Sequence, residues 1–150
     1  MPQVGRDLEF DDDGDIVVDD TGDVKLATAE RTVIQDVEFR VRTDHLDFAP
    51  NSALGANLIA IRGQPNKRLT GSMAKEQIYY SLIKDGRFPR NSLFVDVVPV
   101  GRETIAAFIF VQDYIEGMSQ KLNAYDSSLI VGFNISLDVG LISRITGPKE

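Results

Sequence analysis

The sequence contains no cysteine, so neither a disulfide nor a thiolate metal site contributes to the fold. This absence fits a reducing compartment. The single histidine, His45, lies in a polar stretch that is typical of a turn. No apolar run approaches the roughly 18 residues that a membrane-spanning helix needs, and the first residues lack the apolar core of a signal peptide. We therefore expect the protein to stay in the cytoplasm of the cell that makes it, without a membrane partner.

An excess of positive charge is also lacking. Acidic residues outnumber basic ones 23 to 16, which gives a formal net charge of −7. A nucleic-acid-binding protein normally carries a basic face that neutralises phosphate charge. The alternative is a local basic strip through Arg62, Lys67 and Arg68, although so short a run is usually a solvated loop. We expect no nucleic-acid partner.

The motifs that indicate catalysis are missing. The chain has no G-x-S-x-G turn that would pair a serine with His45, and no glycine-rich nucleotide-binding motif. Glycoside hydrolysis needs two carboxylates at a set separation. Glutamates occur at positions 9, 30, 38, 76, 103 and 116, but no pattern places two of them together. We expect no catalytic residue and no cofactor, and we interpret the chain as a binding protein rather than an enzyme.

The aspartates at Asp11–Asp15 raise the question of a calcium site, because hard cations prefer carboxylate oxygens. Counted from Asp11, positions six and twelve of an EF-hand loop require glycine and glutamate. Those positions hold Ile16 and Gly22. Aspartate is also a favoured turn residue, because its side chain bonds the backbone two residues on. The cluster therefore predicts a turn, and we expect no metal site.

The chain does have the size and composition of one globular domain. It has 150 residues, of which 43% are apolar and 26% are charged. A domain of this length buries about 70% of the surface that its unfolded chain exposes. We expect residues 1–115 to form the main α/β domain. Residues 116–150 are expected to be a C-terminal β extension of the same domain.

Residues 8–28 predict a β-hairpin that leads into a helix. Two β-prone runs, at residues 16–18 and 24–26, flank a turn in which Gly22 supplies the positive φ angle. No internal repeat is evident. Thr28 is a suitable N-cap for a helix over residues 29–43. The buried stripe of this helix is expected to consist of Val33, Ile34, Val37 and Val41.

The remaining residues predict further helices and a sheet. A short helical segment is expected at 53–61, and a second main helix at 72–84 that ends at Gly86. Strands are expected at 93–100, 104–112 and 128–138. The second of these is apolar on both faces, so it should be central or covered on both sides. The fold class is α+β: an N-terminal hairpin, two main helices packed on a mostly antiparallel or mixed β-sheet, and a C-terminal β extension.

Three aromatic residues lie off the predicted apolar stripes, namely Phe39, Tyr80 and Phe88. Two interpretations remain open. They are anchors of an interface with a partner, or they fill satellite pockets of the same fold. The predicted sheet also has at least one exposed edge, and an edge strand is a template for pairing with another chain.

The order of these features resembles a known family. An Asp/Gly-rich hairpin at Asp15–Asp23 leads into a helix that ends in Arg40–Thr43, followed by the segment Leu54–Leu58, a helix to Lys84, Arg87 and the strands. This order resembles the baseplate wedge proteins related to the phage gene product twenty-five, also called sheath initiators. Relatives occur in contractile injection and type VI secretion systems. The resemblance covers about residues 8–112.

The resemblance implies a structural, non-enzymatic role in the tail baseplate of a virion, with synthesis in the bacterial host cytoplasm. Such proteins pack against larger wedge proteins and present a β-strand edge on which the first ring of tail sheath protein is built. Central hub or tube-side proteins are further possible partners. The first alternative is another tail protein, such as a terminator or completion protein, and the second is a cell-wall muramidase.

The family's Glu-Pro-Arg motif precedes its first sheet strand, and this chain has Asp85-Gly86-Arg87 there. Only the arginine carries over directly, with Asp85 as an acidic substitute. We expect Arg87 and the helix at 72–84 to face the wedge, and one edge strand within 93–138 to receive the sheath. Replacing Arg87 with alanine should then weaken incorporation with little loss of stability. The expected partner-binding residues are Arg87, Asp85, Phe88, Phe39 and Tyr80.

Overall fold

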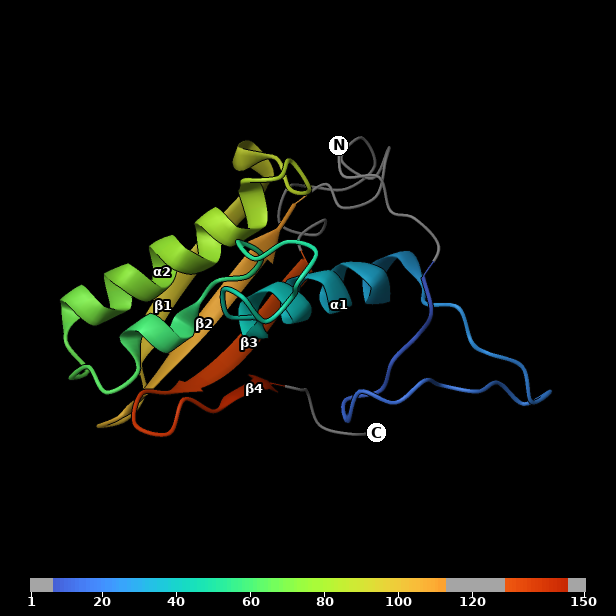
Figure 1. The fold of residues 1–150 in the computed structure, drawn as a ribbon, viewed down its shortest axis with the longest axis horizontal. Coiled ribbons are helices and arrows are strands. Elements are labelled where there is room, and N and C mark those ends of the chain that lie inside the picture. Colours follow the sequence, from blue (N-terminus) through green and yellow to red (C-terminus); the bar gives the residue numbers. More distant parts are fainter. Residues whose placement is uncertain (1–6, 113–128, 146–150) are drawn as a thin grey trace.

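The computed structural model describes residues 7–112 and 129–145, and Figure 1 shows their arrangement. Two helices lie over one face of a sheet. The elements, in chain order, are α1 (Ala29–Arg42), the 3-10 turn η1 (Leu58–Ile61), α2 (Arg68–Ile83), the 3-10 turn η2 (Arg90–Ser92), β1 (Leu93–Pro99), β2 (Thr104–Val111), β3 (Leu129–Ser136) and β4 (Ile142–Ile145).

The sheet is an antiparallel meander in the order β1-β2-β3-β4. This arrangement confirms the expected α+β fold class, and it makes the sheet antiparallel throughout its described strands. β2 is a central strand, as its apolar sequence predicted. The described part of residues 116–150 supplies β3 and β4, which continue the same sheet. β4 was not anticipated as a separate strand, because Ile142–Ile145 is short and mixes apolar and polar side chains.

The first helix forms as the sequence predicts. The hydroxyl oxygen of Thr28 accepts a hydrogen bond from the backbone N–H of Arg31, which satisfies one of the free donors at the helix start. Glu30 lies in the first turn, and Arg40 and Arg42 lie in the last, so both ends suit the helix dipole. α1 therefore begins and ends within one residue of its expected bounds.

The second helix begins at Arg68, four residues before its predicted start. Ser72, its predicted first residue, lies inside the helix, as does Gly71. The backbone N–H of Gly71 donates to the carbonyl of Lys67 over 3.1 Å, and the Thr70 hydroxyl donates to the Pro65 carbonyl over 2.6 Å. These bonds close the first turn in place of a side-chain cap at Lys67, so no N-cap signal marks this start in the sequence.

The helical segment expected at 53–61 is confined to η1, Leu58–Ile61. Gly55 and Asn57 adopt positive φ angles of 100° and 54°, which interrupt any right-handed helix there. The backbone of this segment bonds to α1 instead: Ala56 N–H donates to the Arg40 carbonyl over 2.8 Å.

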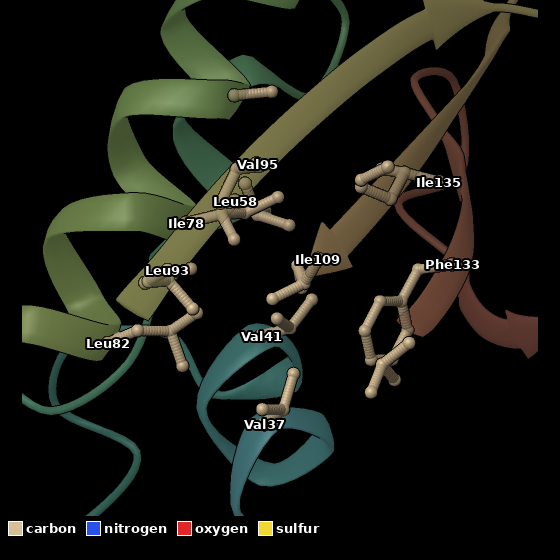
Figure 2. Close-up of a cluster of buried hydrophobic side chains, with 14 of the residues drawn as sticks. Val37, Val41, Leu58, Ile78, Leu82, Leu93, Val95, Ile109, Phe133 and Ile135 are labelled. Carbon is tan, nitrogen blue, oxygen red and sulfur yellow. The ribbon is translucent and has the colours of Figure 1, made fainter. Parts of the chain in front are cut away.

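The core fills the space between the two helices and one sheet face, as Figure 2 shows. Val37 and Val41 of α1, and Ile78 and Leu82 of α2, are fully buried. β3 alternates along its length: Leu129, Val131, Phe133 and Ile135 are buried, while Ile130 is 57% exposed. The core is therefore one-sided, and no helix within residues 7–112 or 129–145 lies over the opposite sheet face.

The segment at residues 7–27, named here the N-terminal arm, lies beside α1 at the end of the molecule away from α2 (Figure 1). It is a triangle of three short strands rather than a single hairpin, with bridges Leu8–Leu26, Phe10–Ile16 and Val18–Val24. Three backbone bonds close the triangle. Glu9 N–H donates to Lys25, Lys25 to Val17, and Val17 to Glu9, over 2.9–3.0 Å.

The N-terminal arm contains an eight-residue repeat, which corrects the expectation that the chain has none. Asp11, Asp12, Gly14 and Asp15 recur as Asp19, Asp20, Gly22 and Asp23. Both expected turns are present, with positive φ angles of 89° at Gly14 and 85° at Gly22. In each turn the first aspartate accepts backbone N–H bonds, which explains the cluster without a metal.

Candidate partner-binding surfaces

Arg87 and Asp85 lie in the connection between α2 and β1, and both form ion pairs with α1. The guanidinium of Arg87 contacts Asp36, with its Nε 2.7 Å from the carboxylate. Asp85 lies 2.7 Å from Arg40 Nη2, and Arg40 also donates to the Ser81 carbonyl. The two pairs tie α1 to the end of α2. Because Arg87 is engaged within the chain, its replacement should cost some stability, contrary to our expectation from the sequence.

Asp85 has a pKa below its usual value of 3.8. Partial burial alone raises this pKa, but several favourable contacts outweigh that effect. They are the hydrogen bond from Arg40, the backbone N–H of Arg87 and the positive charge of Arg40. The carboxylate is thus held ionised by the same contacts that join the two helices.

Phe88 is a core residue, which corrects its expected role as a surface anchor. Only 1% of it is exposed, and it belongs to the main hydrophobic cluster. The Arg87 guanidinium lies 5.6 Å from the centroid of its ring. Phe88 lies outside any helical or strand pattern, so its burial left no periodic signal in the sequence. For Phe88, the interpretation as a residue that fills a pocket of the fold is the correct one.

Phe39 is 51% exposed and packs edge-on against Phe48, with ring centroids 6.3 Å apart. It lines a surface groove of about 390 Å³ between α1 and the N-terminal arm. Phe39 therefore remains available to a partner.

Tyr80 is 62% exposed on the solvent side of α2. Leu69, 71% exposed, and Met73, 37% exposed, precede it by eleven and seven residues. At about 100° per residue, the three side chains fall within one narrow sector of the helix. Leu69, Met73 and Tyr80 form what we name the α2 stripe, a mainly apolar surface that exposed Glu76 interrupts and that no described residue covers. Leu69 could not be placed on this stripe from the sequence because α2 begins earlier than predicted, whereas Met73 lay inside the predicted helix and was not singled out.

A second surface that no described element covers is the sheet face opposite the helices, named here the outer sheet face. Strand alternation and register bring its residues together: Phe94 pairs with Phe110 and Phe110 with Ile130, while Phe108 pairs with Gly132 and Gly132 with Ile145. Phe94 and Ile130 are more than half exposed. The sequence predicted that β2 is either central or covered on both sides. β2 is central, and within the described residues helices cover only one of its sides.

Some apolar surface on the outer sheet face is accounted for by packing within the sheet. A Cβ added at Gly132 would lie 3.2 Å from the Phe108 ring, so this ring lies over the glycine. Phe94 and Phe110 form a cross-strand pair with centroids 5.8 Å apart. Phe94 and Ile130 nevertheless stay more than half exposed on neighbouring parts of this face, which marks it as a candidate interface.

β1 is the edge strand of the sheet within residues 93–138. Gln112 N–H donates to Ser92 and Val100 N–H donates to Thr104, so the intervening even-numbered residues bond to β2. The backbone groups of residues 93, 95, 97 and 99 therefore point outward. Three features reduce the tendency of this edge to pair with other chains. Pro99 has no N–H, Val97 N–H donates to its neighbour Asp96, and Lys75 Nζ lies 5.4 Å from the centroid of the Phe94 ring.

A groove of about 490 Å³ lies between this edge and the first half of α2. We name it the basic groove, because Lys67, Arg68 and Lys75 line it and make no ion pair within the described residues. Asp96, Val97 and Pro99 form the β1 side. The basic strip considered from the sequence is thus divided, since Arg62 lies elsewhere, beside Gly140.

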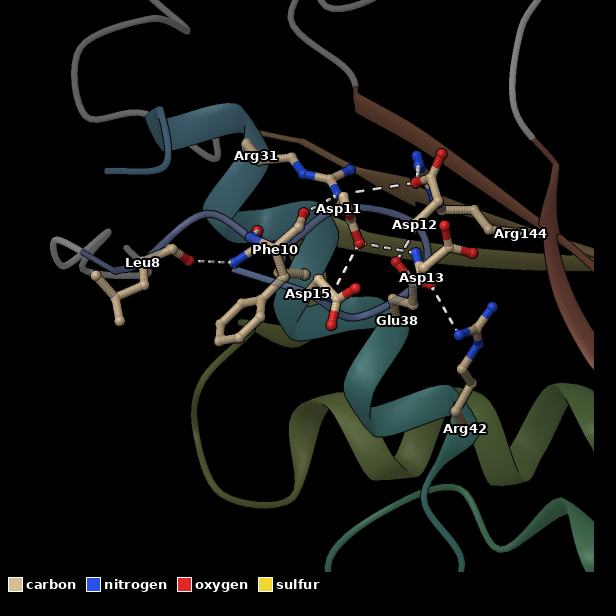
Figure 3. A network of polar contacts seen from close by, with 11 residues as sticks. Leu8, Phe10, Asp11, Asp12, Asp13, Asp15, Arg31, Glu38, Arg42 and Arg144 are labelled. Atoms are coloured by element: carbon tan, nitrogen blue, oxygen red, sulfur yellow. Dashed lines mark hydrogen bonds and ion pairs between the residues drawn. The ribbon is translucent and has the colours of Figure 1, made fainter. Parts of the chain in front are cut away.

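The N-terminal arm is held to the body by a polar network, shown in Figure 3. Asp12 contacts Arg144 of β4 and lies 3.8 Å from Arg31 of α1. Arg144 also lies 3.6 Å from Glu38, which pairs with Arg42 over 3.2 Å. Gln35 adds two bonds to the backbone of Leu8 and Phe10. These contacts fix a segment that sequence reasoning treated only as a hairpin; the repeat was the signal that could have revealed its importance.

Other kinds of site are not in evidence in the described ranges. Residues 7–112 and 129–145 contain no group of three or more acidic or histidine side chains placed to hold a metal ion. Glu116 lies outside the described residues. None of the described helices combines the length and apolar character that crossing a membrane requires.

Comparison of the chain with protein-family models, with curated proteins and with solved structures finds no significant match. The surfaces described above are therefore the basis on which a function is proposed.

Proposed function

We propose that this protein is a structural component of a contractile tail baseplate, where it binds larger wedge subunits and initiates assembly of the tail sheath. The observation that carries the proposal is the one-sided packing of the fold. Helices cover one sheet face, while the α2 stripe, the outer sheet face and the β1 edge have no covering element among the described residues. Contiguous exposed apolar surface of this kind is typical of proteins that are built into assemblies.

In this proposal, α2 contacts the wedge. Tyr80 is the aromatic anchor, and Leu69 and Met73 extend the contact along the helix. Arg87 and Asp85 contribute indirectly, because their ion pairs with Asp36 and Arg40 hold α2 against α1. They act as positioning residues for the surface rather than as its contacts.

β1 is the strand that receives the sheath. An added strand would bond to the outward groups of residues 93–99, and each main-chain hydrogen bond contributes about 0.5–1.5 kcal/mol net. The contacts of Asp96 and Lys75 at this edge are exposed, so displacing them costs little. They protect the free protein from uncontrolled edge pairing without closing the edge to a specific partner.

Site-specific cross-linking in assembled tails tests the proposal. A photoreactive residue at position 80 should capture a wedge subunit, and one at position 98, where Val98 is 40% exposed, should capture the sheath protein. Position 139 is the control, because Val139 is exposed but lies in the β3–β4 turn, away from both surfaces. Adducts only with proteins at the head end of the tail would contradict the wedge placement, and particles that lack this chain would contradict the proposal altogether.

A further inference from the structure

The acidic character of the chain is concentrated in the N-terminal arm. Residues 7–27 contain nine acidic side chains and one basic side chain, so the segment has a formal charge of −8. The net charge of the whole chain is −7, so the remaining residues together carry +1. The protein is thus a nearly neutral body with a strongly anionic arm.

The N-terminal arm also displays apolar side chains. Leu8, Ile16, Val18, Val24 and Leu26 are between 37% and 58% exposed, and they belong to the three bridged pairs that close the triangle. The closed ring of backbone bonds and the anchoring through Asp12 order the arm before any partner arrives. A pre-ordered segment loses little conformational entropy on binding.

The basic groove is complementary to this arm in both respects. Lys67, Arg68 and Lys75 supply positive charge that no ion pair among the described residues neutralises, and Val97 and Pro99 supply an apolar wall beside Asp96. Figure 1 places the arm and the N-terminal half of α2 at opposite ends of the molecule. A copy therefore cannot fill its own groove with its own arm.

We propose that the N-terminal arm of one copy docks into the basic groove of a second copy. The contact joins two different surfaces, so it is heterologous, and successive copies associate head to tail. Opposite charges draw the two surfaces together, and the exposed apolar residues of the arm pack against the groove. This inference concerns self-association and does not depend on the proposed function.

Sedimentation equilibrium of the purified full chain tests this inference. At low salt, the average mass should rise as the concentration increases from about 10 μM to about 1 mM. Raising the ionic strength shortens the Debye length to about 8 Å at 0.15 M, so the association should weaken with added salt. Wild-type protein that stays monomeric at about 1 mM and low salt would overturn the proposal.

Paired variants locate the contact. The groove variant combines Arg68→Glu and Lys75→Glu and should weaken association at least tenfold. The control variant combines Arg62→Glu and Arg90→Glu, which make the same change in net charge outside the groove. It should have a much smaller effect on association. The arm variant combines Asp13→Lys, Asp15→Lys and Asp20→Lys, whose side chains make no hydrogen bond or ion pair within the described residues. Circular dichroism checks that each variant folds.

Mixing supplies the decisive observation. The arm variant keeps an intact groove and the groove variant keeps an intact arm, so each alone should be monomeric and an equimolar mixture should form a dimer. Only a heterologous contact gives this result. The proposal is wrong if the mixture stays monomeric, or if Phe94→Lys with Ile130→Lys on the outer sheet face abolishes association while both charge variants retain it.

Discussion

Gly55 is the residue whose identity the fold constrains most. Its φ angle is +100°, and a Cβ placed on it would lie 2.1 Å from the carbonyl oxygen of Thr43. Glycine is required here for two reasons, the left-handed backbone and the close approach of the loop to the end of α1. The loop in turn accounts for the missing helix at 53–57.

The variant Gly55→Ala should therefore lower the free energy of unfolding by roughly 3 kcal/mol, because neither the angle nor the clash can be relieved cheaply. Gly63→Ala is the matched control. Its φ angle is +80°, but open space surrounds the site, so only the backbone cost of roughly 1–2 kcal/mol applies. Urea unfolding of both variants measures the difference, and equal losses would show that the Thr43 contact does not matter.

The lowered pKa of Asp85 predicts that the stability of the protein depends on pH through this one carboxylate. Its pKa is lowered in the folded state, so its contribution to stability is present above the usual value of 3.8 and is lost as the pH falls through the lower, folded-state pKa. The side chain is 38% exposed, which limits the effect to about 0.5 kcal/mol.

Comparison with Asp85→Asn measures this effect. The stability difference between wild type and variant should be constant from about pH 5 to 7 and should shrink at a pH below 3.8. In an Arg40→Gln background the difference should be smaller at every pH, since the main favourable partner has been removed. A difference that grows on acidification would contradict the assignment.

Among the elements, those with local signals could be predicted from sequence. α1 has a capping threonine and an apolar stripe, and β3 alternates along its length. α2 was predicted too short, because its first turn depends on bonds to Pro65 and Lys67 rather than on a capping residue. β4 depends on pairing with β3, a tertiary contact that four residues of sequence do not encode.

For the candidate surfaces too, features with a local signal could be predicted from the sequence and features that depend on tertiary contacts could not. Phe39 and Tyr80 are exposed, as an interface role requires, whereas Phe88 is buried by contacts that leave no period in the sequence. Asp85 and Arg87 were expected to bind a partner protein, and their ion pairs with α1 could not be predicted, because Arg40 and Asp36 are about 50 positions away and only the fold brings them together. That no described helix covers the outer sheet face could not be predicted, since a strand that is apolar on both faces suggests cover on both sides.

The triangle in the N-terminal arm should open as one unit. Each of Glu9, Val17 and Lys25 donates one backbone hydrogen bond and accepts one in this ring. Loss of one hydrogen bond should therefore weaken the other two. Val17→Pro removes one donor, and hydrogen exchange at Glu9 and Lys25 should then accelerate at least tenfold. The amide of Ile109 in the central strand is the internal control. Unchanged exchange at Glu9 and Lys25 would mean that the three bonds are independent.

At the scale of the whole molecule, the hydrophobic core supplies the stability, and several apolar surfaces outside the core are not covered by any described element. The core lies between the helices and one face of the sheet, while the other face, the β1 edge and the α2 stripe remain accessible in the described structure. A free protein with this much apolar surface is expected to have lower solubility than its net charge suggests.

The placement of charge has a kinetic consequence. Because the excess negative charge lies at one end, the molecule has a large electric dipole, and an approaching cationic surface turns it arm-first before contact. Such orientation increases the fraction of collisions that are productive. Added salt should therefore slow the capture of this chain much more than it speeds its release.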